Sequence, residues 1–376
     1  MNRRRIPFLA AAWLLAAAAA ARGQDAPAPT QTPTPVPEPP PAAPTPAPGL
    51  AVNPTFFNPS IAVIGNFLAS VGNNPVQSTP AFQVRESEIS FQAIVDPYAR
   101  ADLFLSFNNN GVEVEEGFIT FLTLPWQTQA KAGKFKTQFG KINTLHLHVL
   151  PWVDEPLPID DILLSPDTWA GEGISVSKLI ELPGDTFSEL YVQVLDGTSG
   201  EGLFIAPSKS DLTYNGQYRI FRDFGDDHNM EVGFSYAHGH NGTSTTNTTN
   251  LQNAHLVYRW KPLQGRPYRS LIVRSEYFWS QREQPDGTQK AQGFFAAADW
   301  QLARRWFTGA RYEFSDHALN ASLRDKGVAA TLTFMPSEFS MLRAEYRYRD
   351  YAPGIKASEG FLQIQFAIGA HGAHPF

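Results

Sequence analysis

The chain has 376 residues, a formal net charge of −6 and no cysteine. The missing cysteines exclude a small secreted scaffold held by disulfides, and the acidic balance argues against a nucleic-acid partner. Aromatic residues make up 12% of the chain although its mean hydropathy is slightly negative, at −0.26. Apolar side chains are therefore expected to be sorted by face along short elements instead of being collected in long apolar segments.

The N-terminus has the pattern of an export signal. Arg3, Arg4 and Arg5 precede an apolar run that ends near Ala21 and is followed by small residues. This run is shorter than the roughly 20 residues that a membrane helix needs. We expect residues 1–23 to be a signal peptide, with a retained N-terminal anchor as the alternative.

Residues 24–49 are rich in Pro, Ala and Thr. Such a segment does not bury a core and favours extended polyproline II, so a periplasmic linker is expected.

From residue 50 onward, apolar residues recur with a period of two, which is typical of strands with one apolar and one polar face. Near the C-terminus, Leu342 and Tyr346 fall on one face, and Arg343, Glu345 and Arg347 fall on the other. Segments of about 10 to 14 residues suit a tilted membrane strand better than the shorter strands of a soluble β-sandwich, the alternative fold. The pattern therefore predicts an all-β, transmembrane antiparallel β-barrel over residues 50–376.

About sixteen segments fit this pattern, and 14 to 18 strands are compatible with it, because an even number closes a single-chain barrel. They are 61–69, 82–95, 98–107, 112–124, 127–136, 172–182, 186–195, 211–223, 228–239, 250–261, 267–282, 290–301, 304–315, 326–335, 338–350 and 359–370.

The connections between these segments alternate in length, as expected for short periplasmic turns and longer external loops. Tight turns are predicted at Asp96-Pro97, Pro125-Trp126, Pro183-Gly184-Asp185, Gly225-Asp226-Asp227, Ala303-Arg304 and Met335-Pro336. Longer loops are predicted at 69–81, 137–171, 196–210, 240–249, 316–325 and 352–358. Both ends of the barrel are then periplasmic.

The last segment alternates as well, with Leu362, Ile364, Phe366 and Ile368 in the same parity as the terminal Phe376. It resembles the C-terminal signature of outer-membrane proteins. This resemblance implies that Phe376 is the assembly signal read by the barrel-assembly machinery.

Residues 132–140 read Ala-Gly-Lys-Phe-Lys-Thr-Gln-Phe-Gly and resemble the strand-end motif of the phosphate-selective porin O/P family. Residues 58–65 resemble the opening strand of porin-like outer-membrane proteins. The resemblance implies an outer-membrane porin in a Gram-negative-type bacterium, with anions such as phosphate among its solutes. It rests on Gly133, Lys134, Phe135, Lys136 and Phe139.

The connection 137–171 is the third external loop and the longest. The third loop of general porins folds into the lumen, which implies a constriction here; a loop lying over the outer surface is the alternative. Its ionisable residues predict an acidic constriction and are His146, His148, Asp154, Glu155, Asp160 and Asp161.

Several later strands place charged residues in the parity expected to face the lumen. If their arginines stand opposite the loop carboxylates, a transverse field orients passing solutes. Alternatively, these residues pair with neighbouring strands and stiffen the wall. The predicted pore-lining residues are Arg274, Glu276, Arg311, Glu313, Arg343, Glu345, Arg347 and Arg349.

Two His-x-His pairs, His146 with His148 and His238 with His240, put two imidazoles on one side of an extended segment. No third ligand is identified for either pair, and loop histidines are commonly solvent-exposed. We expect no metal site and no cofactor.

These observations predict a non-enzymatic porin of the outer membrane that allows ion transport and passive diffusion of small hydrophilic solutes through a water-filled barrel narrowed by residues 137–171. A plugged structural or adhesive barrel is the alternative. A hydrolase using His238 and Ser244 is less favoured, since no carboxylate is placed beside them. The expected partners are the lipid bilayer, lipopolysaccharide, the barrel-assembly machinery and small solutes, with no nucleic acid. Whether the barrels form a homotrimer is left open.

Overall fold

The computed structural model describes residues 59–108, 111–164, 168–262 and 268–369, which belong to the unit Val52–Phe376. The predicted signal peptide 1–23, the linker 24–49 and the assembly signal Phe376 lie outside the described residues.

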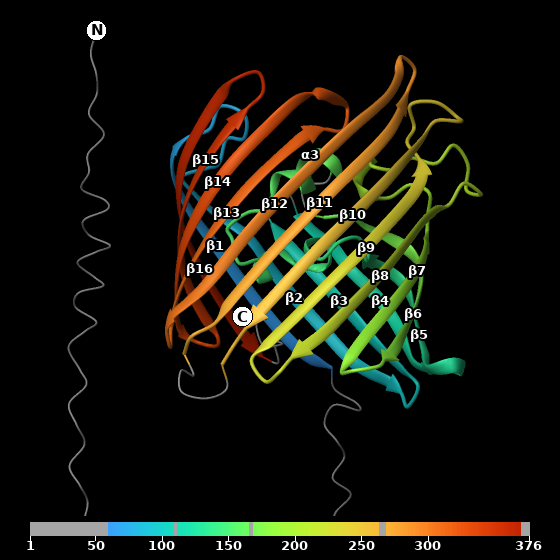
Figure 1. Ribbon diagram of the computed structural model, residues 1–376, viewed down its shortest axis with the longest axis horizontal. Helices are drawn as coiled ribbons and strands as arrows, with labels where there is room; N and C mark the ends of the chain where they lie inside the picture. The colour runs from blue at the N-terminus through green and yellow to red at the C-terminus, as the bar shows by residue number, and fades with distance from the viewer. Residues whose placement is uncertain (1–58, 109–110, 165–167, 263–267, 370–376) are drawn as a thin grey trace, which may run out of the picture. The chain divides into compact units, whose positions relative to one another are not determined.

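Over the described residues, sixteen antiparallel strands pair in chain order, and β1 closes the ring on β16 (Figure 1). The alternating pattern thus produces the predicted fold class and strand number. The strands are β1 (Ser60–Asn73), β2 (Phe82–Asp96), β3 (Ala99–Asn108), β4 (Gly111–Leu124), β5 (Thr128–Lys136), β6 (Ala170–Leu182), β7 (Thr186–Leu195), β8 (Thr213–Phe224), β9 (His228–His240), β10 (Thr248–Trp260), β11 (Leu271–Gln284), β12 (Gly287–Ala303), β13 (Trp306–His317), β14 (Asn320–Ser337), β15 (Ser340–Tyr351) and β16 (Ile355–Gly369).

Short helices occupy some of the connections. The turn between β4 and β5 is the 3₁₀ helix η1 (Pro125–Gln127), and the connection between β7 and β8 contains η4 (Gly200–Gly202). The long loop, residues 137–169, contains η2 (Ile142–Thr144), η3 (Leu147–Val149) and the α-helix α3 (Leu157–Ile162). None of the helices in the described part of the chain has the length and hydrophobicity to cross a membrane.

The period-two pattern separates two environments on each strand. In β9, Val232, Phe234 and Tyr236 point outward and are 43–50% exposed, whereas Glu231 and Ser235 are buried inside the ring. A surface of exposed apolar and aromatic side chains is stable in lipid but not in water. The fold is therefore a transmembrane β-barrel.

Three predicted connections are wrong. The segment 316–325 is not a long loop, because β13 and β14 pair up to His317 and Asn320 and leave a two-residue turn. The loop predicted at 352–358 shrinks to 352–354. The polar residues of these segments favour loops. However, a strand that extends beyond the bilayer has water on both sides, so it carries polar residues on both faces and lacks the alternating pattern.

The turn predicted at Met335-Pro336 is also misplaced. Both residues belong to β14, where the pairing with β15 shifts between Phe334 and Ser337. A proline is tolerated at such an irregularity, and the turn follows at 338–339.

The expectation of a polar lumen is only partly right, because the barrel interior also contains a fully buried hydrophobic group. The inner apolar cluster combines side chains of the long loop and of the connection after β7 with inward-facing residues of the strands. Its members are Phe135, Phe139, Ile142, Leu150, Trp152, Ile159, Ile162, Leu163, Trp169, Leu195, Leu203, Phe204, Ala237, Leu251, Phe278, Ala291, Phe295 and Ala297.

Replacing Phe234 by arginine tests the assignment of the outer face. Phe234 lies at the middle of β9 with half of its surface exposed. Near the bilayer centre, an arginine facing lipid costs about 2–4 kcal/mol. We expect Phe234→Arg to lower the free energy of unfolding in lipid vesicles by that amount, measured by denaturant titration. Thr245→Arg, at an exposed loop tip, is the control and should change it by less than about 0.5 kcal/mol. Equal effects would contradict the assignment.

Candidate functional site

The long loop enters the barrel directly after β5. Gly133 has a φ of +134°, and a Cβ there would lie 2.2 Å from the carbonyl oxygen of Gly117 on β4, so the position requires glycine. Phe135 and Phe139 of the porin-like motif then join the inner apolar cluster. Figure 1 shows α3 within the ring of strands.

Aromatic contacts join the two ends of the loop and attach its middle to the wall. The ring of Phe139 packs edge-on against Trp169, with centroids 5.8 Å apart. Further along, Trp152 packs edge-on against Phe295 of β12 at 5.7 Å. Since a buried tryptophan contributes about 3–5 kcal/mol relative to alanine, the contact of Trp152 holds the loop strongly to the wall.

Inward-facing glutamates satisfy the backbone amides of the loop. The amide of Ile142 donates to Glu276 at 2.7 Å, and that of Val153 donates to Glu345 at 2.7 Å. Glu313 accepts from the amide of Leu157 at 3.2 Å. A buried irregular segment needs such partners, because it lacks the hydrogen bonds of regular secondary structure.

Arginines do the same for the loop carbonyls. Arg343 donates to the carbonyl oxygens of Leu150 and Trp152, both at 3.0 Å. Arg311 donates to the carbonyl oxygen of Asp154 at 3.0 Å. Glutamates of the wall therefore accept hydrogen bonds from the N–H groups of the loop backbone, and arginines of the wall donate to its carbonyl groups.

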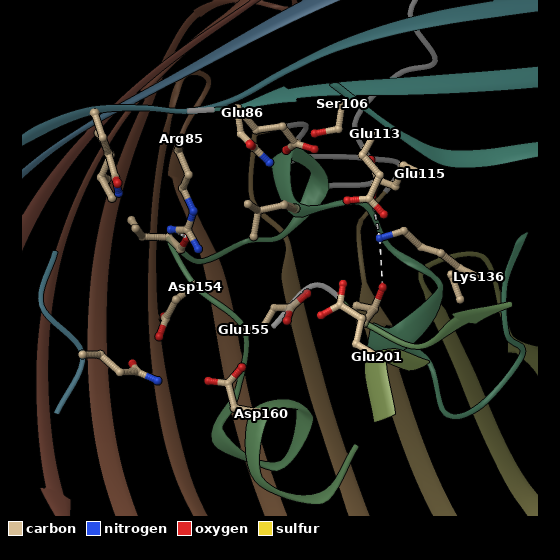
Figure 2. Close-up of a pocket in the computed structure, with 18 of the residues that line it drawn as sticks. Arg85, Glu86, Ser106, Glu113, Glu115, Lys136, Asp154, Glu155, Asp160 and Glu201 are labelled. Carbon is tan, nitrogen blue, oxygen red and sulfur yellow. Dashed lines mark hydrogen bonds and ion pairs between the residues drawn. The ribbon is translucent and has the colours of Figure 1, made fainter. Parts of the chain in front are cut away.

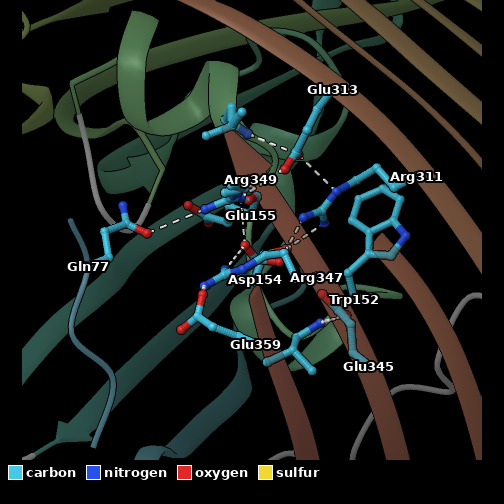
Figure 3. A network of polar contacts seen from close by, with 12 residues as sticks. Gln77, Trp152, Asp154, Glu155, Arg311, Glu313, Glu345, Arg347, Arg349 and Glu359 are labelled. Carbon is cyan, nitrogen blue, oxygen red and sulfur yellow. Dashed lines mark hydrogen bonds and ion pairs between the residues drawn. The ribbon is translucent and has the colours of Figure 1, made fainter. Parts of the chain in front are cut away.

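The side chain of Asp154 is the centre of this network (Figure 3). It forms ion pairs with Arg311 at 2.8 Å, with Arg349 at 2.7 Å and with Arg347. Burial opposes ionisation of this carboxyl, but the charges of the three arginines outweigh it and hold the pKa of Asp154 well below its ordinary range. The carboxylate is therefore charged at any physiological pH.

All eight predicted pore-lining residues are buried, and most of them contact the loop. Arg274 instead pairs with Asp299 of the neighbouring strand β12. Of the eight, Arg347 and Arg349 line the polar cavity between the long loop and the wall, which is described below. The arginines near Asp154 contact it, so they do not stand across an open passage from that carboxylate as predicted.

A polar cavity of about 520 Å³ lies between the long loop and the wall formed by β2 to β5 (Figure 2). Three predicted constriction residues, Asp154, Glu155 and Asp160, line it. The opposite wall supplies charged residues that sequence reasoning missed. They are Arg85, Glu86, Glu113 and Glu115; Lys134 and Lys136, which belong to the predicted porin-like motif, line the same wall.

Two β-bulges explain why Arg85 and Glu115 were missed. The pairing of β1 with β2 shifts between Asn66 and Phe67 and leaves Arg85 without a partner residue. The pairing of β3 with β4 shifts at Phe104 and Leu105 and leaves out Glu115. A bulge interrupts the alternation, so adjacent residues both approach the interior. The two adjacent acidic residues at positions 115 and 116 interrupt the alternation and are the sequence signal from which this bulge could be predicted.

The two loop histidines face carboxylates from these strands. Nδ1 of His146 lies 2.8 Å from Glu88 and 3.3 Å from Glu115, and Nδ1 of His148 lies 3.5 Å from the same Glu88 oxygen. Burial opposes protonation of His146, but its bonds to Glu115 and Glu88 outweigh burial and raise the pKa of His146 to about 10. The site therefore attracts positive charge.

The last predicted constriction residue, Asp161, lies in a separate group with His317 and Asp325. Burial, together with the charges of Asp325 and Asp160, raises the pKa of Asp161 to about 8. The second histidine pair is not joined to comparable partners: His238 bonds to Asn250 at 2.9 Å, and His240 lies 4.0 Å from Asp211. Ser244 accepts hydrogen bonds from amides of its own loop.

A closed sixteen-strand barrel with an apolar outer surface and a loop packed inside it has the fold of outer-membrane porins and channels. DcaP, an outer membrane channel of Acinetobacter baumannii, superposes with a TM-score of 0.57 at 11% identity, covering 83% of this chain and 96% of that one. An anion-selective porin from Comamonas acidovorans gives 0.57 at 11% identity, covering 83% and 100%. OprB of Pseudomonas putida gives 0.54 at 9% identity, covering 83% and 94%.

In sequence, an uncharacterized protein of Aquifex aeolicus (strain VF5) is 28% identical over 337 residues, covering 78% of this chain and 70% of that one. No protein-family model matches the chain. The resemblance to the phosphate-selective porin O/P family therefore stays a prediction.

Replacing Asp154 by asparagine tests the central network. The change leaves Arg311, Arg347 and Arg349 buried without their shared counter-charge, so we expect the free energy of unfolding to fall by about 3–5 kcal/mol. Asp160→Asn is the control: burial raises the pKa of Asp160 to about 6, so at pH 5 its carboxyl is mostly neutral and resembles an amide. Denaturant unfolding at pH 5 measures both, and equal losses would refute the network's importance.

Proposed function

We propose that this protein is a porin of the outer membrane in a Gram-negative-type bacterium and that small hydrophilic solutes and ions diffuse through it passively. The observation that carries this proposal is the polar cavity of about 520 Å³ that remains inside the barrel beside the docked loop. A sixteen-strand barrel is wide enough for an aqueous channel, whereas an eight-strand barrel fills with side chains. The long loop narrows the passage without filling it.

The charge of the cavity lining favours cations. Its acidic residues outnumber its basic residues eight to five, and several of the basic groups are already paired with carboxylates. The acidic ones are Glu86, Glu113, Glu115, Asp154, Glu155, Asp160, Glu172 and Glu201, and the basic ones are Arg85, Lys134, Lys136, Arg347 and Arg349. We therefore favour cations over the anions that the family resemblance implies.

Planar-bilayer recording in a KCl gradient tests both the pore and its selectivity. We expect stable single-channel steps and a reversal potential of the sign given by K⁺ preference. In Glu155→Gln/Glu201→Gln, which removes two lining charges, the reversal potential should move toward zero; Asp286→Asn, at an exposed strand connection, should leave it unchanged. A reversal potential of the opposite sign would support anions such as phosphate. If the folded protein shows no conductance, a plugged structural or adhesive barrel is favoured.

Replacing Trp152 by alanine tests whether the loop narrows the passage. Trp152 is fully buried between Phe295 and the guanidinium of Arg311, so its loss should loosen the loop from the wall. We expect larger or noisier single-channel steps than in the unmodified protein. Trp126→Ala removes a tryptophan that is 83% exposed in the turn after β4, and conductance should not change. Identical conductance in both variants would show that the loop does not limit flow.

A further inference from the structure

The structure joins side chains from three distant segments at one end of the cavity. Glu86 and Glu88 come from β2, Glu115 comes from β4, and the histidines at 146 and 148 come from the long loop. Ligand atoms of Glu88, His146 and His148 lie within 4.8 Å of one another, as do those of Glu86, Glu88 and Glu115. Glu88 belongs to both groups and so connects them.

The separations between these atoms suit a shared metal ion. The two Nδ1 atoms and the oxygens of Glu88 and Glu115 are 2.8, 3.3 and 3.5 Å apart in the measured pairs. Around a tetrahedral ion with bonds of about 2.0–2.1 Å, ligand atoms lie roughly 3.3 Å apart.

The burial of the carboxylates indicates a missing positive charge. Glu86 is only 6% exposed, and within the described residues its Oε2 atom accepts no hydrogen bond. Lys136 contacts Glu115 at 2.8 Å and the protonated His146 contacts Glu88 at 2.8 Å, so Glu86 is the carboxylate of the three that has no ion pair among the described residues. Buried carboxylates are stable when they are paired or when they coordinate a metal. A divalent cation that displaces the proton of His146 supplies the charge that Glu86 lacks and still balances Glu88.

We propose that His146, His148 and Glu88, with Glu86 and Glu115 beside them, bind a divalent first-row transition-metal ion such as Zn²⁺. Two imidazoles with carboxylates favour such ions over Ca²⁺ and Mg²⁺, which prefer oxygen ligands alone. The site is reached from the cavity, because Glu86, Glu115 and Leu147 line that cavity.

The bound ion connects the long loop to β2 and β4, whereas the Asp154 network connects it to β13 and β15. His146 also lies near a further carboxylate, because its Nε2 atom is 4.0 Å from Glu116. The inference does not depend on solute diffusion, since binding is measured without a membrane current.

Calorimetric titration of Zn²⁺ into the chelator-treated, folded full-length protein in detergent tests the proposal. We expect one equivalent to bind, and Glu88→Gln/His148→Gln to weaken binding at least about tenfold. The second His-x-His pair of the chain offers a control, because His238→Gln/His240→Gln removes two imidazoles, one more than the test variant, and should leave the affinity unchanged. Equal affinities in the two double variants, no binding by the unmodified protein, or tighter binding of Ca²⁺ than of Zn²⁺ would each overturn the proposal.

X-ray absorption of the Zn²⁺-loaded, unmodified protein gives a second answer that does not rely on variants folding. The proposal requires two imidazole nitrogens and carboxylate oxygens around the ion. A coordination shell with no imidazole would refute it.

Discussion

The docked loop depends on one electrostatic constraint, the placement of the Asp154 carboxylate among three arginines of β13 and β15. Each of these charges is buried, and the arginines also pair with Glu313 and Glu359, so the network is stable as a whole. The same wall residues also bond to the loop backbone, as Arg311 and Arg343 do to its carbonyls. Charged residues thus replace the hydrogen bonds that a strand or helix makes within itself, and this allows irregular backbone inside the barrel.

The loop divides the interior unequally. Its apolar side chains pack on β11 and β12 through Phe278 and Phe295, where the wall is hydrophobic. Its polar edge faces β2 to β5, where bulges add charged residues to the lining. The polar cavity therefore lies on the charged side, lined by carboxylates of both walls and by Arg347 and Arg349 of the Asp154 network.

Much of the barrel was predictable from sequence, because lipid and water impose opposite demands on alternate residues. The face of each charged residue in β15 follows from parity alone, as Arg343 and Glu345 show. Parity does not show what a buried charge contacts, so the docking of the loop on Glu276 and Glu345 was not foreseen. Bulges break parity itself, which is why Glu115, one of the carboxylates facing His146, escaped notice.

Hydrogen–deuterium exchange over residues 140–157 tests most directly whether the loop is docked inside the barrel. The amides of Gly140, Ile142 and Val153 donate to inward-facing side chains of β9, β11 and β15. Docking therefore predicts exchange as slow as that of the strands, whereas the exposed connection 243–247 exchanges fast. Exchange of the loop amides as fast as that of 243–247 would contradict the account.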